Sequence, residues 1–316
     1  MSLVKHTNQK TSFGEAFGFK NIDVPISSLT ELGEGTNVEL NDVFIFDKDV
    51  VKIILMSVEL KDNLLLWGDA GAGKTDLIEQ VAARLNRQAF IISFGEETSI
   101  RQLIGSFTIS KGETPFRDGI LMKAIKTPHA IIGLDEINMA YPGVVAMLNH
   151  LLQKREIIIP ETGDIVKVAE GVRFFATSNT NMGVDESGLF EGSQSQNAAT
   201  RSRFAGLQIK YLKPEQELEL INKAYPYLNK EIPEEGGKLY AEQSVKLANM
   251  LRDAMRSGGL SLPFSVRQLH RFIKASLRLS DPVLAFKYSY WNLLDSTERQ
   301  TAGDLFQTVF GLKVTD

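Results

Sequence analysis

At about 150 residues per domain, a chain of 316 residues has room for two structural units and is too long for a single small module. Hydrophobic residues make up 43% of it and charged residues 23%; these values match ordinary globular proteins and exclude an intrinsically disordered chain. With 35 basic and 39 acidic side chains the net charge is −4, so charge alone does not point to nucleic acid or anionic membranes as partners. The absence of cysteine excludes disulfides, thiolate nucleophiles, iron–sulfur clusters and cysteine-based zinc sites.

No stretch of the sequence reaches the roughly 18 uninterrupted apolar residues that a membrane-spanning helix needs. The richest segment, residues 50–60, is interrupted by Lys52, Ser57 and Glu59. Residues 1–10 carry two lysines and a histidine with no apolar block after them, so we expect no secretory signal. We therefore expect a cytoplasmic protein.

The first 40 residues are rich in Gly, Ser, Thr and Asn and lack sustained periodicity, which predicts an extended arm packed on the unit that follows. From Asp47, a suitable N-cap, apolar residues recur at helical spacing as far as Leu60. This pattern predicts a helix that ends at about Leu60.

Five short apolar segments read as strands, and helical patterns alternate with them. The strands are expected at residues 63–67, 89–93, 130–134, 172–177 and 207–211. Such alternation predicts the α/β class, here a three-layer αβα core over residues 41–212 with a parallel sheet covered on both faces. In such sheets functional residues gather at the carboxyl ends of the strands.

After residue 213 no strand pattern appears, and apolar residues keep the i, i+3, i+4 spacing of helices. Helices are expected at residues 215–223, 241–256, 265–279, 282–293 and 296–310. Residues 213–316 are therefore predicted to form an all-helical lid domain.

A phosphate-binding loop lies between the first predicted strand and a helix expected over residues 74–85. Its sequence is Gly68-Asp69-Ala70-Gly71-Ala72-Gly73-Lys74-Thr75, which matches the pattern Gly, four residues, Gly, Lys, Ser/Thr. The glycines let backbone N–H groups surround a phosphate, and the helix N-terminus adds partial positive charge. Lys74 is predicted to reach the β- and γ-phosphates of ATP, and Thr75 to hold Mg²⁺ through its hydroxyl.

Two neighbouring carboxylates, Asp135 and Glu136, follow a buried strand. Successive strand residues point to opposite faces, so we expect Asp135 to face Mg²⁺ and Glu136 to face the attacking water. The alternative is an ordinary helix cap. Asn179 ends another apolar strand; its carboxamide is predicted to orient the water or contact the γ-phosphate, the alternative being a turn residue.

Together these residues resemble the AAA+ ATPases, with residues 68–75 as Walker A, Asp135 and Glu136 as Walker B, and Asn179 as sensor 1. The resemblance continues through nearly the whole chain and is closer to the MoxR branch of that family, and within it to the CobS proteins, the ATPase subunits of aerobic cobaltochelatase. It is carried further by residues 17–19, 78–86 and 116–121 and by the tail from residue 285 to residue 311.

The resemblance also implies roles for two arginines of the carboxyl-terminal half. Arg203 is similar to the arginine finger and Arg267 to sensor 2. Where the family carries Asp-Arg before an aromatic residue, this chain has Ser202-Arg203, preceded by Arg201. Either arginine can be the finger, and the alternative for each is a surface salt bridge.

Two hairpins fit insertions of the MoxR branch. One is predicted from strands at 157–160 and 165–168, and the other spans residues 106–116 with Lys111-Gly112 at its tip. The resemblance implies that both face the central pore of a ring; the alternative is that they are surface hairpins.

The resemblance implies Mg²⁺-dependent ATP hydrolysis by a ring-forming motor, a hexamer, within a chelatase-like complex. The implied partner is a protein that carries a von Willebrand factor A domain. A nucleic-acid motor or loader is the alternative, and the net charge of −4 argues against it. A module that binds nucleotide without turnover is a second alternative, and the adjacent Asp135 and Glu136 argue against that one.

Overall fold

The computed structural model describes residues 3–108, 114–183, 195–228 and 234–315. They fall into two units, which are treated separately below: residues 1–42, 46–68 and 74–209 form the first unit, and residues 43–45, 69–73 and 210–316 form the second. Among the described residues, no helix is long and apolar enough to cross a membrane.

A five-stranded parallel sheet forms the centre of the first unit. Its strands are β1 (Leu64–Trp67), β2 (Ala89–Ser93), β5 (Ile131–Asp135), β8 (Arg173–Ser178) and β9 (Ala205–Gln208), in the order β2-β5-β8-β1-β9. The predicted α/β class with a parallel sheet is confirmed. The prediction of the last strand at 207–211 was displaced, because β9 pairs with β1 from Leu64↔Ala205 to Trp67↔Gln208, and the partner strand sets its limits.

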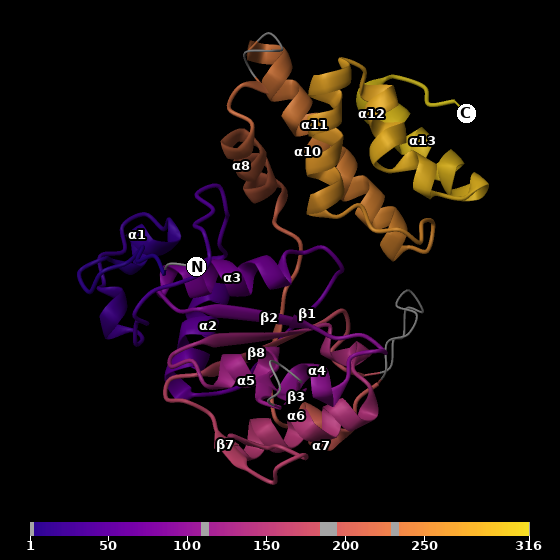
Figure 1. The fold of residues 1–316 in the computed structure, drawn as a ribbon. Coiled ribbons are helices and arrows are strands. Elements are labelled where there is room, and N and C mark those ends of the chain that lie inside the picture. Colours follow the sequence, from indigo (N-terminus) through magenta and orange to yellow (C-terminus); the bar gives the residue numbers. More distant parts are fainter. Residues whose placement is uncertain (1–2, 109–113, 184–194, 229–233, 316) are drawn as a thin grey trace. The chain divides into compact units, whose positions relative to one another are not determined.

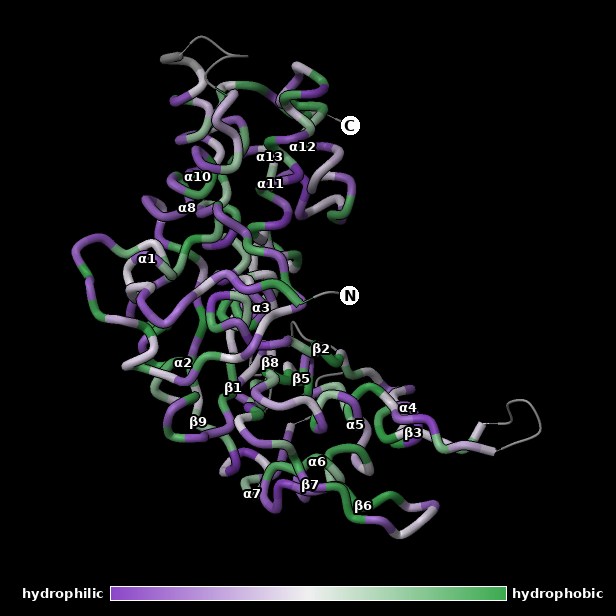
Figure 2. The backbone as a smooth tube through the Cα atoms, turned by 60° about the vertical axis from the view of Figure 1, so that its left-hand side comes forward, coloured by the Kyte–Doolittle hydropathy of each residue, from purple (hydrophilic) through white to green (hydrophobic). Residues whose placement is uncertain are grey.

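The central strands are apolar because helices cover both faces of the sheet. All six residues of β8 are buried, as are the first four of β5; Figure 2 shows where the hydrophobic and hydrophilic residues lie along the backbone. Helix α3 (Lys74–Arg84) connects β1 to β2, whereas α5 (Ile120–Ile125) and α6 (Pro142–Lys154) lie on the return path through β5 to β8. Right-handed crossovers place these two sets on opposite faces, as α3 and α5 are in Figure 1.

The remaining helices of the first unit are short, except α2. They are α1 (Phe13–Phe17), α2 (Lys48–Leu60), α4 (Ile100–Ile104), α7 (Ala198–Arg201) and the 3-10 helices η1 (Ile26–Ser28) and η2 (Ile137–Met139). The side chain of Asp47 accepts hydrogen bonds from the backbone N–H groups of Asp49 and Val50, which confirms the predicted N-cap of α2.

Two antiparallel hairpins extend from the first unit. Strands β6 (Glu156–Ile158) and β7 (Ile165–Lys167) confirm the hairpin predicted at 157–168. Strands β3 (Gly105–Phe107) and β4 (Phe116–Asp118) pair at the base of the other, and its predicted tip, Lys111-Gly112, lies outside the described residues. That either hairpin faces a pore stays a prediction.

The amino-terminal arm packs on the first unit but is not wholly extended. Ser12 and Glu15 form a capping box, which starts the one-turn helix α1. The rings of Phe13 and Phe17 lie 5.4 Å apart, and Phe46 meets Phe17 edge-on at 5.0 Å. The arm is therefore held in place by the burial of these aromatic rings.

The second unit is helical. Its elements are α8 (Pro214–Ala224), α10 (Glu234–Arg256), α11 (Val266–Leu279), α12 (Pro282–Ser289), η3 (Trp291–Leu293) and α13 (Ser296–Phe310). The predicted helical region after the core is confirmed, although α10 begins seven residues before the expected 241. Phe286 and Phe306 stack with ring centroids 4.6 Å apart, and Phe272 meets both edge-on, so an aromatic core joins α11, α12 and α13.

Candidate active site

The glycine loop after β1 has a backbone that only glycine adopts easily. Gly68 has φ 145°, and a Cβ atom on it would lie 2.0 Å from the carbonyl oxygen of Ile209. Gly73, just before α3, has φ 84°, a left-handed value that disfavours other residues. The loop therefore brings bare backbone to the N-terminus of α3, which suits an anionic ligand.

The first side chain of α3, Lys74, lies inward and is 7% exposed. Its Nζ donates to the carbonyl oxygen of Gly68 at 2.8 Å and to Oδ1 of Asn179 at 3.0 Å. Nδ2 of Asn179 lies 3.4 Å from both carboxylate oxygens of Glu136. The Asn179 amide thus bridges the ammonium of the phosphate loop and the carboxylate after β5.

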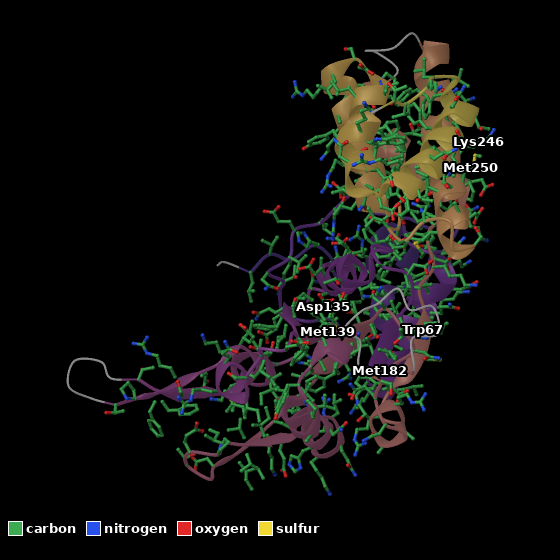
Figure 3. The ribbon with its side chains drawn as sticks, turned by 90° about the vertical axis from the view of Figure 1, so that its right-hand side faces the viewer. Trp67, Asp135, Met139, Met182, Lys246 and Met250 are labelled. Atoms are coloured by element: carbon green, nitrogen blue, oxygen red, sulfur yellow. The ribbon has the colours of Figure 1, made fainter. Side chains whose placement is uncertain are left out.

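Three hydroxyl groups contact the carboxylate of Asp135, the last residue of β5. Figure 3 labels Asp135 among the side chains of the structure. Thr75 donates to its Oδ1 at 2.7 Å and Thr177 donates to the same oxygen at 2.6 Å. Ser93, the register partner of Asp135 on β2, donates to Oδ2 at 3.4 Å. Three neighbouring strands and the start of α3 therefore converge on one carboxylate.

The backbone of Glu136 is left-handed, with φ 56° and ψ 43°. Its N–H donates to the hydroxyl oxygen of Thr177 at 3.0 Å, and its carbonyl accepts the N–H of Met139 at 2.8 Å as η2 begins. This conformation is uncommon outside glycine and costs on the order of 1–3 kcal/mol. It turns the chain sharply at the end of β5.

The carboxyl group of Glu79 interacts with two other carboxylates near the end of β5. Burial raises the pKa of the Glu79 carboxyl on α3, and the charges of Asp76 and Asp135 raise it further. Burial is therefore the larger cause of the raised pKa, and the neighbouring carboxylates add to it. The carboxylate of Asp135 and the hydroxyl of Thr75 are hard oxygen donors, the type that Mg²⁺ prefers.

Arg203 lies elsewhere in the first unit, after α7. Its Nε donates to the carbonyl oxygen of Asn149 at 3.2 Å, its Nη2 donates to Oε1 of Gln153 at 2.9 Å, and its Nη1 contacts the carbonyl oxygen of Ala199. Arg201 is exposed, whereas Arg203 is half-buried. The structure thus separates the two finger candidates by their surroundings, and the role of each stays a prediction.

Arg267 belongs to the second unit, where it is exposed at the second position of α11, after the N-cap Ser265. The tip of the phosphate loop groups with the same unit. Tyr211 donates to the carbonyl oxygen of Ala70 at 2.6 Å, and Arg256 pairs with Asp69 at 3.5 Å. Burial raises the pKa of Tyr211 to about 12, so its hydroxyl stays a donor at neutral pH.

The structure brings most of the predicted site residues of the first unit together. Lys74, Thr75, Asp135, Glu136 and Asn179 form one hydrogen-bonded group when Thr177 is included. The sequence interpretation assigned no role to Thr177, Ser93 or Tyr211. The polar residues at the end of a largely apolar strand were the signal for Thr177; Tyr211 gave none, because its partner is a backbone carbonyl.

Comparison with known proteins agrees with this geometry. Residues 63–204 match the family described as AAA domain (dynein-related subfamily). The chain is 25% identical over 311 residues to aerobic cobaltochelatase subunit CobS of Sinorhizobium sp, over 96% of this chain and 92% of that protein.

Two further relatives match over about half of this chain. The chaperone candidate BssE of Thauera aromatica is 33% identical over 163 residues, which cover 51% of this chain and 54% of that protein. Protein NorQ of Paracoccus denitrificans is 31% identical over 159 residues, 50% of this chain and 56% of that protein. Residues 63–204 therefore match the AAA domain family, and the similarity to CobS, BssE and NorQ supports an AAA+ protein of the MoxR type.

Proposed function

We propose that this protein is a Mg²⁺-dependent ATPase that works as a ring, a hexamer, and remodels or activates a partner protein. The observation that supports this most directly is the hydrogen-bonded group at the carboxyl edge of the sheet. There the Asn179 amide is hydrogen-bonded to Lys74 on one side and to Glu136 on the other, and Thr75 donates a hydrogen bond to Asp135.

In this proposal each side chain has a separate task. Lys74 and the N-terminus of α3 bind the β- and γ-phosphates. Glu136 orients or deprotonates the attacking water, and Asn179 keeps that carboxylate in place beside the γ-phosphate. Phosphoryl transfer depends on positioning and charge neutralisation more than on covalent chemistry, and these groups provide both.

Thr75 and Asp135 are the residues that would hold Mg²⁺. Their oxygens are 2.7 Å apart, and the donor set of one hydroxyl and one carboxylate fits an ion that takes one or two protein oxygens along with phosphate oxygens. The ion would neutralise charge on the transferred phosphoryl group.

The carboxylate of Glu136 is the group to test. Glu136→Gln should lower turnover by at least 100-fold, the usual contribution of a general base, while ATP binding stays within about twofold of the unmodified protein. Glu34→Gln, an exposed carboxylate of the arm, is the matched control and should be unchanged. Lys74→Ala should weaken ATP binding itself. Unmodified turnover in Glu136→Gln would refute the proposed role.

The partner is proposed from the relatives. CobS is named as a subunit of aerobic cobaltochelatase, and BssE as a chaperone candidate, which favours action on another protein in a chelatase-like complex. We expect a protein with a von Willebrand factor A domain to bind the assembled ring and alter its ATPase rate. Capture with the Glu136→Gln protein and ATP tests this; capture of DNA alone, with DNA-stimulated turnover, would support the nucleic-acid motor or loader instead.

A further inference from the structure

Thr177, the next-to-last residue of β8, contacts both acidic residues at the end of β5. Its hydroxyl donates to Oδ1 of Asp135 at 2.6 Å and accepts the backbone N–H of Glu136 at 3.0 Å. A hydroxyl has one proton to donate and lone pairs to accept, so the two hydrogen bonds can form at the same time. One side chain on β8 therefore fixes the carboxylate of one residue and the backbone of the next.

The second of these contacts falls on a strained segment. Glu136 has a left-handed backbone, φ 56° and ψ 43°. Unlike glycine, it carries a Cβ atom, which disfavours this conformation. Such a conformation persists where the surroundings impose it. Extended backbone at this position would carry β5 onward and would take the Glu136 carboxylate away from Asn179, which lies 3.4 Å from it.

Thr177 does not contact ligands directly, because it is 2% exposed and lies behind the carboxylate that it holds. Thr75 also donates to Oδ1 of Asp135, but its hydroxyl is assigned to Mg²⁺ in the proposed function. The Ser93 hydroxyl is 3.4 Å from Oδ2, a long and weak contact. Of these three hydroxyl groups, that of Thr177 is therefore the one that is close to Asp135 and is not assigned to a ligand.

We infer that Thr177 is a positioning residue for ATP hydrolysis: its hydroxyl keeps Glu136 in the left-handed conformation that aims its carboxylate, and keeps Asp135 in register with Thr75. The inference rests on the proposed ATPase function. It extends the site by a residue that acts through Asp135 and Glu136 and touches neither nucleotide nor water.

The test compares variants of Thr177 that differ in the hydroxyl. Thr177→Val keeps the side-chain shape and removes both hydrogen bonds, so kcat should fall about 10- to 100-fold, as expected for a misplaced reacting group. ATP affinity should stay within about twofold, because Lys74 and the glycine loop are unchanged. Thr177→Ser retains the hydroxyl and should stay within about threefold of the unmodified kcat.

Thr36 supplies a matched control. It is also a fully buried threonine, and its hydroxyl also accepts a backbone N–H, that of Val38 at 3.1 Å, but in the arm. Thr36→Val should leave kcat unchanged. If Thr177→Val does not fold, by circular dichroism and thermal melting, Thr177→Ala takes its place, because alanine sets no methyl group against the Asp135 carboxylate.

Three results would overturn the inference. They are unmodified kcat in a folded Thr177→Val or Thr177→Ala protein, an equal loss in Thr177→Ser, and a loss of ATP affinity that accounts for the whole defect. Glu136→Gln distinguishes this from failure of the proposed function. If Glu136→Gln is inactive while Thr177→Val is fully active, only the inference fails; if Glu136→Gln is fully active, the proposed ATPase site is wrong.

Discussion

In the sheet of the first unit, the charged side chains at the amino edge, where the parallel strands begin, differ in burial and partners from those at the carboxyl edge, where the strands end. At the amino edge, Arg87 is 1% exposed and donates to the carbonyl oxygens of Glu31 and Gly171 at 2.7 and 2.8 Å. Arg173 is buried beside it and donates to the carbonyl oxygen of Val58 at 2.6 Å. Burial, together with the neighbouring Arg173, lowers the pKa of Arg87 to about 10.

At the carboxyl edge the two carboxylates are half-exposed and contact hydroxyls and an amide, whereas the ammonium of Lys74 is buried. Asp135 and Glu136 are both partly accessible, and their contacts run through side chains of other strands. The buried arginines hold backbone segments together, whereas the carboxyl-edge groups are held in place by uncharged side chains. Burial and partner type therefore distinguish the two amino-edge arginines from the two carboxylates of the candidate site, and Lys74 combines burial with a side-chain partner, Asn179.

Arg203 gives the strongest test of that rule, because it donates to backbone carbonyls as the amino-edge arginines do, yet is only half-buried. If it is the finger of a neighbouring subunit's site, Arg203→Ala should lower turnover by about 10³–10⁵-fold while nucleotide binding persists. Arg201→Ala is the matched control and should have little effect. Steady-state ATPase rates of the two variants decide between them.

Mixing the two inactive proteins, Arg203→Ala and Glu136→Gln, sharpens the same prediction. Some activity should return, because a mixed interface pairs an intact Glu136 with an intact Arg203 of the next subunit. A silent Arg203→Ala together with an inactive Arg201→Ala would assign the finger to Arg201. Full activity in monomers would exclude a finger that acts between subunits.

The second unit contains a buried salt bridge, which can be compared with the buried arginines of the first unit. Arg252 and Glu217 are 1% and 0% exposed and form two hydrogen bonds of 2.8 Å. Arg252→Met should lower the free energy of unfolding by about 3–5 kcal/mol, because it leaves Glu217 buried and unpaired. The double variant Arg252→Met with Glu217→Leu should regain most of that loss in denaturant titrations. A double variant as unstable as the single one would show that the pair itself is required.

At the amino edge, Arg87→Met should lower the free energy of unfolding by about 3 kcal/mol, since the carbonyl groups of Glu31 and Gly171 lose their donors. The ATPase rate per folded molecule should not change. The exposed Arg101→Met on α4 is the control, with an effect below about 0.5 kcal/mol. A large loss of kcat in folded Arg87→Met would break the separation of the two edges.

Most of the fold could be predicted because its strands are short apolar runs between helical patterns. The α8, α11 and α13 segments, with their i, i+4 spacing, were also recognisable. Helix α10 was not fully predicted: Gly236 and Gly237 disfavour helix, and residues 234–240 are helical nevertheless. Helices α4 and α5, with five and six residues, are too short to give a periodic signal.

The candidate site also has parts that sequence spacing predicts and parts that depend on contacts between strands. That Lys74, Thr75, Asp135 and Glu136 come together could be predicted from the spacing of two local sequence motifs, and their chemical roles stay predictions. The role of Thr177 depends on which strand lies next to β8, and the left-handed backbone of Glu136 depends on that contact. Neither follows from spacing along the chain, because both arise from the β5–β8 pairing.

The smallest expected effect concerns His270, a titratable group enclosed in the second unit. Its Nδ1 lies 2.7 Å from the hydroxyl of Tyr225, and burial, followed by the charge of Lys274, lowers the pKa of His270 below its usual 6.5. The unfolded chain therefore takes up the proton first as pH falls. The stabilising contribution of the neutral ring is complete above pH 6.5 and is lost as pH falls from 6.5 through the lowered pKa.

His270→Asn removes this titration, so the difference in melting temperature between pH 7.5 and pH 5.5 should be smaller in that variant than in the unmodified protein. An equal difference in both proteins would mean that His270 keeps its contact with Tyr225 in either charge state, and the enclosed groups of the second unit would then not respond to pH.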